Sequence, residues 1–414
     1  MLRRFQLIVL AAVLAVAAFS TGAEFLFFLL YLAILVVGGA YVVTRFGLAD
    51  LEAGYVLDRL HAQAGDTLRA TYTIRNTSRL PKLWLEAYNP TNLPVAIPGR
   101  AVSLGPRQER AWTVRIQLTR RGHFRVDPLV LRTGDPLGLF ESSATVGSHS
   151  DVIVYPRVEA LPAWRLPPAA LEGAHAHPVR TPHSTPQVTT IRPYLPGDAY
   201  NRIHWKATAR HNDLQVKEFD LEQTADVWIF LDLEAAAHTG AGDESTVEYA
   251  VRAAASIGAK ALLEGRSLGM TAAGARRLVL PPDRGPRQYQ KVMQLLAGVD
   301  DDGSRPFGDV LVEGVTRLRR GMTAVAITPA LERAWVRPLA TLRARGVATV
   351  VVLPDAVGLA TGLAPAERER RQRAARALLH ALREYDLEPY HLRPRQTLAS
   401  QLTSHTPRLA AAVG

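Results

Sequence analysis

Two apolar runs within the first 45 residues constrain this chain more than any other feature. Residues 5–19 and 25–43 are almost uninterrupted hydrophobic stretches, separated by a short turn that contains Glu24. One helix through both runs would be roughly 58 Å long at about 1.5 Å per residue, which is about twice the hydrocarbon thickness of a bilayer. The pattern therefore predicts a transmembrane hairpin over residues 1–45, built from two spanning helices.

The charges that flank these runs indicate an orientation. Arg3 and Arg4 precede the first run and Arg45 follows the second, whereas the turn carries only Glu24. Because basic flanks favour the cytoplasmic side, we expect both ends of the hairpin and all later domains to be cytoplasmic. The alternative is a cleavable signal peptide that ends in the small residues 20–23. The second apolar run begins where a mature soluble protein would start, which favours the hairpin.

Composition limits the remaining possibilities. The 414 residues leave room for two to four domains, and the hydrophobic share of 48% is sufficient for packed cores. The chain has no cysteine, which excludes disulfides, thiolate catalysis and Cys-ligated metal sites. A formal charge of +11 favours an acidic partner, such as nucleic acid, anionic lipid or an acidic protein.

Two regions with different periodicity follow the hairpin. Over residues 50–158, short alternating runs such as TLRATYTIRNTS (67–78) and RAWTVRIQLT (110–119) predict a small antiparallel, immunoglobulin-like sandwich. Residues 159–190 are rich in proline and predict an extended connector.

Strands and helices then alternate over residues 191–400. The apolar run at 226–233 is typical of a buried strand, and residues 247–265 have a helical apolar face that ends at Gly265. The alternation continues to a long helix from about Pro365 to Asp386 and a last strand. This pattern predicts an α/β domain with a mainly parallel sheet and helices on both faces, and it leaves 401–414 as a tail.

A charged stretch at the start of the α/β region is the first candidate site. Pro196 and Gly197 fit the centre of a type II turn, after which Asp198 would cap a short helix. In such a helix, Arg202, Lys206 and Arg210 would lie four residues apart on one face. They would repel one another unless acidic groups paired with them.

This stretch has three interpretations. In the first, nearby acidic residues pair with the cations, and Ile203 and Trp205 anchor the helix in the core. In the second, the cations form a surface that docks a partner. In the third, His204 acts as a general base, although no nucleophile is apparent beside it.

Other motifs have weaker support. Residues 265–269 match G-x-S-x-G, but a helix precedes the serine and a strand follows it, which is the reverse of a nucleophile elbow. P-loop, G-x-G-x-x-G and H-E-x-x-H motifs are absent. His175, His177 and His183 lie in the Pro-rich segment without the spacing of a metal site. The arginines of the long C-terminal helix alternate with glutamates, which is typical of a solvated helix, although lipid headgroups are an alternative partner.

The stretch IRPYLPGDAYNRIHWKATARHNDLQVKEFD, followed by VWIFLDL, resembles the signature block of the domain-of-unknown-function-58 family, which comprises bacterial proteins similar to the von Willebrand factor A fold. The segments 120–140 and 152–158 also resemble the region that precedes this block. The residues that agree with the signature are Arg192, Tyr194, Gly197, Asp198, Arg202, Ile203, Trp205, Ala209, Arg210, Leu214 and Val216.

The resemblance implies a Rossmann-like von Willebrand factor A-type α/β domain at 191–400, with its signature at 192–232. It also implies a multi-pass protein of the bacterial inner membrane that works beside a MoxR-type AAA+ ATPase, and possible association with a transglutaminase-like membrane protein. True A domains bind Mg²⁺ through Asp-x-Ser-x-Ser after the first strand. Here Asp232 is followed by Glu234 and Ala236, and the later Thr-Asp-Gly is matched at best by Thr328-Pro329-Ala330. We therefore expect no metal and no cofactor at this degenerate site.

Together these features favour a non-enzymatic, membrane-anchored adaptor or scaffold that binds protein partners and touches membrane lipid. Its expected partner-binding or signature residues are Arg192, Tyr194, Gly197, Asp198, Arg202, His204, Trp205, Lys206 and Arg210. One alternative is a hydrolase or metal-dependent binding protein with a cleft near Asp198, His204 and Asp232. A second is a nucleic-acid-binding protein, which net charge alone suggests and membrane tethering opposes.

Overall fold

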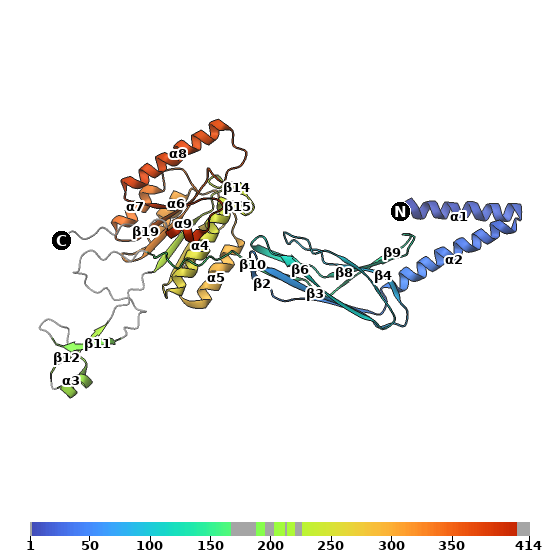
Figure 1. Cartoon of the computed structure of the whole chain (residues 1–414), viewed down its shortest axis with the longest axis horizontal. Helices are drawn as coiled ribbons and strands as arrows, with labels where there is room; N and C mark the ends of the chain where they lie inside the picture. Colours follow the sequence, from blue (N-terminus) through green and yellow to red (C-terminus); the bar gives the residue numbers. More distant parts are fainter. Residues whose placement is uncertain (1, 167–187, 195–202, 212, 220–225, 404–414) are drawn as a thin grey trace. The chain divides into compact units, whose positions relative to one another are not determined.

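A computed structural model describes residues 2–166, 188–194, 203–211, 213–219 and 226–403 (Figure 1). The chain divides into two compact units. Unit 1 comprises residues 1–157 and 293–298, and unit 2 comprises residues 158–292 and 299–414. The change from strand-rich to alternating sequence thus coincides with a change of structural unit.

Unit 1 begins with two helices, α1 (Leu2–Thr21) and α2 (Glu24–Gly47), which are joined at Gly22 in the left-handed region (φ 66°). The 24 residues of α2 reach about 36 Å, and the helix is long and apolar enough to cross a membrane. In α1, the apolar part is shorter and covers Ala11–Thr21. An apolar helix near the N-terminus is therefore confirmed. By length and composition it fits a membrane anchor or a signal sequence, and the two-span hairpin stays a prediction.

Residues 51–155 of unit 1 are built mainly from strands. They form three sheets with the orders β1-β3-β6, β2-β10-β7 and β5-β4-β8-β9, in which only the β2–β10 pair is parallel. Their bounds are β1 (Leu51–Leu57), β2 (His61–Gln63), β3 (Thr67–Asn76), β4 (Lys82–Tyr88), β5 (Arg100–Leu104), β6 (Glu109–Gln117), β7 (Gly122–Val126), β8 (Leu129–Gly134), β9 (Glu141–Val146) and β10 (Ser150–Tyr155).

Alternation along these strands separates core from surface, as the sequence predicts. In β3, the buried apolar side chains are Leu68, Ala70, Tyr72 and Ile74, and the residues between them face outward. Tyr72 stacks on Trp112 of β6, with ring centroids 5.2 Å apart. The β-rich character of this region is confirmed.

Unit 2 has a six-stranded sheet in the order β17-β16-β13-β18-β19-β20. All neighbours pair in parallel except β16 and β17. The strands are β13 (Val227–Asp232), β16 (Leu268–Ala273), β17 (Arg277–Asp283), β18 (Thr323–Ile327), β19 (Ala348–Pro354) and β20 (Pro389–Leu392). The mixed α/β fold with a mainly parallel sheet is thus confirmed. The strand order reverses between β13 and β18, and in open α/β sheets ligands bind at the carboxyl ends of the strands at such a point.

Helices follow the strands of this sheet. They are α4 (Thr246–Leu263), α5 (Gly285–Gly298), α6 (Phe307–Val315), α7 (Val336–Ala344), α8 (Pro365–Glu384) and α9 (Leu398–Thr403), with the short strands β14 (Gly240–Ala241) and β15 (Glu244–Ser245) before α4. Ser245 caps α4 by accepting from the backbone N–H of Glu248, and Gly265 follows the helix with φ 75°. Both ends of α4 therefore agree with the sequence prediction.

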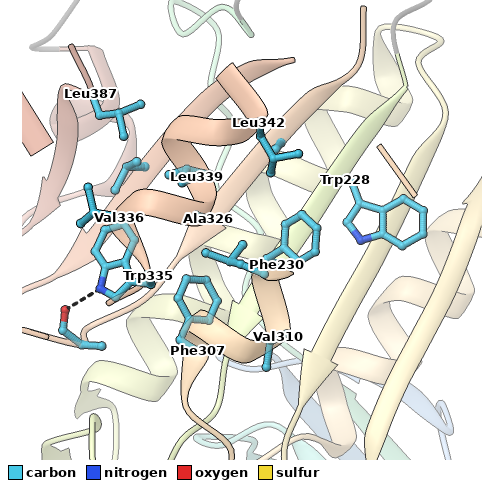
Figure 2. Packing of buried hydrophobic residues seen from close by; sticks show 14 of the residues in the cluster. Trp228, Phe230, Phe307, Val310, Ala326, Trp335, Val336, Leu339, Leu342 and Leu387 are labelled. Carbon is cyan, nitrogen blue, oxygen red and sulfur yellow. Dashed lines mark hydrogen bonds between the residues drawn. The ribbon is translucent and has the colours of Figure 1, made fainter. Parts of the chain in front are cut away.

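The core on one side of the sheet is rich in aromatic side chains (Figure 2). Phe230 of β13 lies near Phe307 of α6 and Trp335, which precedes α7. The indole Nε1 of Trp335 donates to the carbonyl oxygen of Ala330 at 3.3 Å, so its buried polar atom is satisfied. All six residues of β13 are buried, which explains its continuous apolar sequence.

The predicted connector begins with a packed segment. Leu161, Trp164 and Leu166 are buried within unit 2, and the Trp164 ring meets Tyr390 of β20 in a T-shaped contact at 6.3 Å. The backbone N–H of Glu159 also donates to the Ser256 hydroxyl of α4. Residues 167–187, which carry the three histidines of the connector, lie outside the described residues.

Candidate functional site

The signature stretch forms a small module, here called the signature module, that consists of β11 (Val188–Pro193), α3 (Trp205–His211) and β12 (Gln215–Phe219). The two strands are antiparallel, and Arg192 lies opposite Val216. Beyond the strand, the backbone N–H of Tyr194 donates to the carbonyl of Leu214 at 2.8 Å. In sequence, α3 therefore lies in the connection between two strands that pair with each other.

His204 has a structural role at the start of α3. Its ring Nδ1 accepts a hydrogen bond from the backbone N–H of Ala207 at 3.0 Å, and the backbone N–H of His204 donates to the carbonyl of Gln215 at 2.7 Å. This is the geometry of an N-cap residue. The N–H of Ala207 is shared, because it also donates to the backbone carbonyl of His204 at 2.9 Å. The ring nitrogen that a general base would need is thus engaged in capping.

The helix begins later than predicted. Ile203 forms an isolated bridge with Val216, and α3 starts only at Trp205. The prediction that Arg202 shares a helical face with Lys206 and Arg210 falls on a residue outside the described ones. Capping by His204 explains this start. Lys206 and Arg210 do lie four residues apart on α3, and both are exposed.

The predicted core anchors of this helix differ in their outcome. Ile203 is buried, as expected, together with Ala207 and Val216. Trp205 is 68% exposed, so the prediction that it anchors α3 in the core is wrong. The helix buries its Ala207 side, which leaves the indole on the outer side.

The remaining signature residues are placed less fully. Arg192 is known by its backbone position in β11, and Tyr194 is half-buried. Gly197, Asp198 and Arg202 lie outside the described residues. The part of the predicted site that can be assessed is therefore α3 and its two flanking strands.

A second polar cluster lies at the carboxyl ends of β13 and β18, where the strand order reverses. Asp232 ends β13, and Thr328 directly follows β18. The Thr328 hydroxyl donates to Oδ2 of Asp232 at 2.5 Å, and the backbone N–H of Glu234 donates to Oδ1 at 3.0 Å. Asp232 is buried, and desolvation raises the pKa of its carboxyl to about 7 although both hydrogen bonds lower it.

His238 completes this cluster. Its Nε2 lies 3.0 Å from the carbonyl oxygen of Asp232, and its Nδ1 lies 3.0 Å from the hydroxyl of Thr246 in α4. Sequence reasoning missed both this histidine and the contact between Thr328 and Asp232. For Thr328 a signal existed, because the apolar run at 323–327 resembles that of β13 and ends at the same edge of a parallel sheet. No comparable signal marked His238.

The donor set at this edge does not fit the magnesium site of an A domain. Both carboxylate oxygens of Asp232 accept hydrogen bonds within the protein, and the positions of the two hydroxyl ligands hold Glu234 and Ala236. Within the part of the chain that the structure describes, no group of three or more His, Asp or Glu side chains is placed to hold a metal ion. The arrangement instead ties β13 to β18.

The G-x-S-x-G match is structural. Its serine, Ser267, lies between the end of α4 and the start of β16, in the order that the sequence predicts. The Ser267 hydroxyl donates to the carboxylate of Asp226, which precedes β13. The serine therefore links the starts of two neighbouring strands, far from the carboxyl edge of the sheet.

Comparison with known proteins finds a family match. The model of the family described as "Protein of unknown function DUF58" matches residues 190–359, which include α3, β12 and the sheet from β13 to β19. Residues 190–359 of this chain match the DUF58 family. The uncharacterized protein YeaD of Bacillus subtilis (strain 168) is 26% identical over 310 residues, which cover 72% of this chain and 74% of YeaD. Apart from the first two residues of β11, both candidate regions lie within the residues that match the family.

Solved structures add little. The CARDB domain of the PF1109 protein from Pyrococcus furiosus has a TM-score of 0.19 and 17% identity, and the match covers 25% of this chain and 92% of that chain. A beta-glucosidase from Listeria innocua has a TM-score of 0.17 and 15% identity, with coverage of 25% and 16%. At such TM-scores the likeness supports no conclusion about the fold or function of this chain.

Proposed function

We propose that this protein is a membrane-anchored, non-enzymatic adaptor that uses the outer face of α3 to bind a protein partner, in particular a MoxR-type AAA+ ATPase. The observation that carries this proposal is the exposure of Trp205, at 68%, beside the exposed cations Lys206 and Arg210. Tryptophan and arginine are enriched among the residues that dominate binding energy at interfaces. A tryptophan held outward on a capped helix suits that role.

The charge of this face indicates the chemistry of the partner. Lys206 and Arg210 lie on one side of α3, and like charges at this spacing repel each other by a few tenths of a kcal/mol. An acidic surface on the partner would remove this repulsion and would increase the association rate. The partner surface that we propose is therefore acidic, with an apolar recess for the indole of Trp205.

The strand order of the sheet in unit 2 supports a more specific proposal about the domain types. In chain order, the sheet has the order 3-2-1-4-5-6 with an antiparallel edge strand, which fits a von Willebrand factor A-type domain. We also propose that the strand-rich region of unit 1 is an immunoglobulin-like sandwich. In this proposal α1 and α2 form a two-span hairpin in the bacterial inner membrane, with the rest of the chain in the cytoplasm.

The groups that a hydrolase would use are engaged elsewhere. His204 uses Nδ1 to cap α3, and the carboxylate of Asp232 accepts hydrogen bonds from Thr328 and Glu234 in a buried position. A catalytic base and a nucleophile need access to substrate, which a buried and doubly hydrogen-bonded carboxylate does not have. This geometry favours a binding module over the hydrolase alternative.

Charge reversal on α3 tests the proposal. The double variant Lys206→Glu and Arg210→Glu is expressed at full length, and its co-purification with the AAA+ partner is measured from detergent-solubilised membranes, with and without nucleotide. We expect the partner to be lost while the free energy of unfolding changes by no more than about 0.5 kcal/mol, because both side chains are exposed.

The matched control is Arg373→Glu and Arg376→Glu. These exposed residues of α8 give the same change in net charge within another helix of unit 2. The control should retain the partner. Equal co-purification by the α3 variant and the wild type would contradict the proposal, and equal loss in both variants would show an effect of net charge alone.

A further inference from the structure

One end of the strand region in unit 1 exposes large apolar side chains beside α2. They come from the start of β4, from the segment that leads into it and from the turn between β8 and β9. Together they are here called the rim: Leu80 (59% exposed), Leu83 (59%), Trp84 (40%) and Leu137 (54%). Gly134 connects the two parts, because a Cβ at that position would lie 3.5 Å from the Trp84 ring. Contiguous exposed apolar groups of this kind mark an interaction surface.

The rim is held against the last turns of α2 (Figure 1). The aromatic rings of Tyr41 and Phe140 meet edge to face at 5.7 Å. At the end of the helix, a Cβ on Gly47 would lie 2.7 Å from the side chain of Thr133, so only glycine allows this close approach. The strand region is therefore packed on α2 along two helical turns, from residue 41 to residue 47.

These contacts fix the depth of the rim if α2 crosses a membrane. The hydrocarbon core takes about 20 helical residues, so a span that starts near Glu24 leaves it near residue 43. Tyr41 lies inside that stretch, and Gly47 lies about 9 Å further along the helix. Because Phe140 contacts Tyr41, this end of the strand region lies at the level of the lipid headgroups.

Basic side chains accompany the apolar ones. Arg45 and Arg79 are exposed near the rim, and the ammonium of Lys82 donates to the carbonyl of Phe46 at 2.7 Å, at the C-terminal end of α2. A cation is favourable at that end of a helix dipole, although burial lowers the pKa of Lys82. Tryptophan beside arginine and lysine is the composition typical of a membrane interface.

A pocket of about 220 Å³ lies between α2 and the rim. Its walls are mainly apolar and include Val42, Val43, Phe46, Leu80, Leu83 and Trp84. In water, the apolar surface of such a pocket would carry a free-energy cost of about 25 cal/mol per Å² of exposed area. Hydrocarbon from the outermost part of an acyl chain would remove that cost, because the pocket begins at the level where α2 leaves the membrane core.

We infer that the rim is a membrane-contacting surface, which inserts Leu80, Leu83, Trp84 and Leu137 into the interfacial region of a lipid bilayer around the end of α2. This inference rests on the proposed membrane anchoring and goes further, because it holds the strand region against the bilayer instead of leaving it on a free stalk. The ligand is lipid: acyl chains for the pocket and rim, and anionic headgroups for Arg45 and Arg79.

The absence of cysteine in this chain provides a clean test. Leu83→Cys and Leu137→Cys are labelled with a nitroxide in the full-length protein, which is reconstituted into vesicles of phosphatidylcholine and phosphatidylglycerol. Collision rates are then measured with oxygen, which concentrates in hydrocarbon, and with a water-soluble nickel complex. Leu35→Cys in the middle of α2 and Leu60→Cys beyond the distant end of β1 are the references, since both side chains are exposed in the structure.

We expect the labels at 83 and 137 to collide with the nickel complex several-fold less often than the label at 60, and with oxygen more often. Collision rates equal to those at position 60 would overturn the inference while leaving the anchor intact. Protection from both reagents would also overturn it, because it would show that protein covers the rim. If the label at position 35 is itself in water, the membrane anchoring fails, and that outcome is distinct from a failure of the rim alone.

Discussion

Two polar regions of unit 2 direct their side chains in opposite ways. At the carboxyl edge of the sheet, Asp232 is buried and satisfied by Thr328 and Glu234, so its charge is directed inward. On α3, the indole of Trp205 and the cations Lys206 and Arg210 are directed outward. The comparison separates a buried cluster that holds two strands together from an exposed surface that we propose meets a partner.

Removing the hydroxyl of Thr328 should give the largest change in stability. Thr328→Val keeps the shape of the side chain but leaves the buried carboxylate of Asp232 without one of its two donors and the N–H of Ala330 without its acceptor. We expect the free energy of unfolding at pH 8 to fall by about 3 kcal/mol, as measured by urea unfolding in detergent with tryptophan fluorescence. Thr341→Val on the exposed side of α7 is the control, and it should change stability by about 0.5 kcal/mol or less. An equal, small effect of both variants would show that the Asp232 cluster contributes little.

The raised pKa of Asp232 should make stability depend on pH. Because burial raises this pKa from 3.8 to about 7, the folded state binds more protons than the unfolded state between these values. Stability should therefore fall as pH rises from about 4 through about 7 and then level off. The contribution between pH 5 and pH 8 is on the order of 2–3 kcal/mol.

Asp232→Asn isolates this effect, since asparagine does not titrate. The difference in unfolding free energy between variant and wild type should shift in favour of the variant as pH rises from 5 to 8. The unfolding midpoint in urea, recorded at each pH, measures the shift. A difference that does not vary with pH would show that the carboxyl titrates near its ordinary pKa.

Truncation of Trp205 should act on binding and leave stability unchanged. We expect Trp205→Ala to weaken the affinity for the AAA+ partner by about 2 kcal/mol, which is roughly 30-fold, because a central aromatic residue of an interface contributes that much. Tyr385→Ala removes another exposed aromatic side chain of unit 2 and should have no effect on affinity. Calorimetric titration of the purified proteins gives both values. An unchanged affinity for Trp205→Ala would remove the indole from the interface.

Loss of the cap at His204 should have the smallest effect. His204→Ala leaves the N–H of Ala207 without its side-chain acceptor and should destabilise α3 by about 1 kcal/mol. His204→Asn supplies another capping oxygen and should restore most of this loss. Faster amide hydrogen exchange within α3, and not elsewhere in unit 2, is the expected readout. If Asn fails where His succeeds, the imidazole has a role beyond capping.

Local pattern was sufficient to predict much of this fold. The apolar run at 226–233 became the central strand β13, and the apolar face at 247–265 became α4 with Gly265 beyond its end. These features depend on residues close together in the sequence, so the apolar pattern and the position of glycine are sufficient to predict them. The long helix α8 was likewise predicted from Pro365, and it ends two residues before the predicted limit.

The candidate site depended on contacts that local pattern does not contain. Thr328 and Asp232 are 96 residues apart, and they meet because β13 and β18 pair in parallel with Leu231 opposite Ile327. The outward direction of Trp205 depends on where α3 starts, which the cap at His204 and the bridge of Ile203 decide. The sequence predicts Trp205 as a core anchor because tryptophan is more often buried than exposed.

The most direct test of the proposed docking surface is site-specific photo-crosslinking in cells. A benzophenone amino acid replaces Trp205 on α3 or, as the comparison, Ala236, which is exposed beside the Asp232 cluster. The account predicts that irradiation crosslinks position 205 to the AAA+ ATPase and that position 236 gives no such product. Crosslinks from position 236 with none from position 205 would contradict it, because they would place the partner at the edge of the sheet.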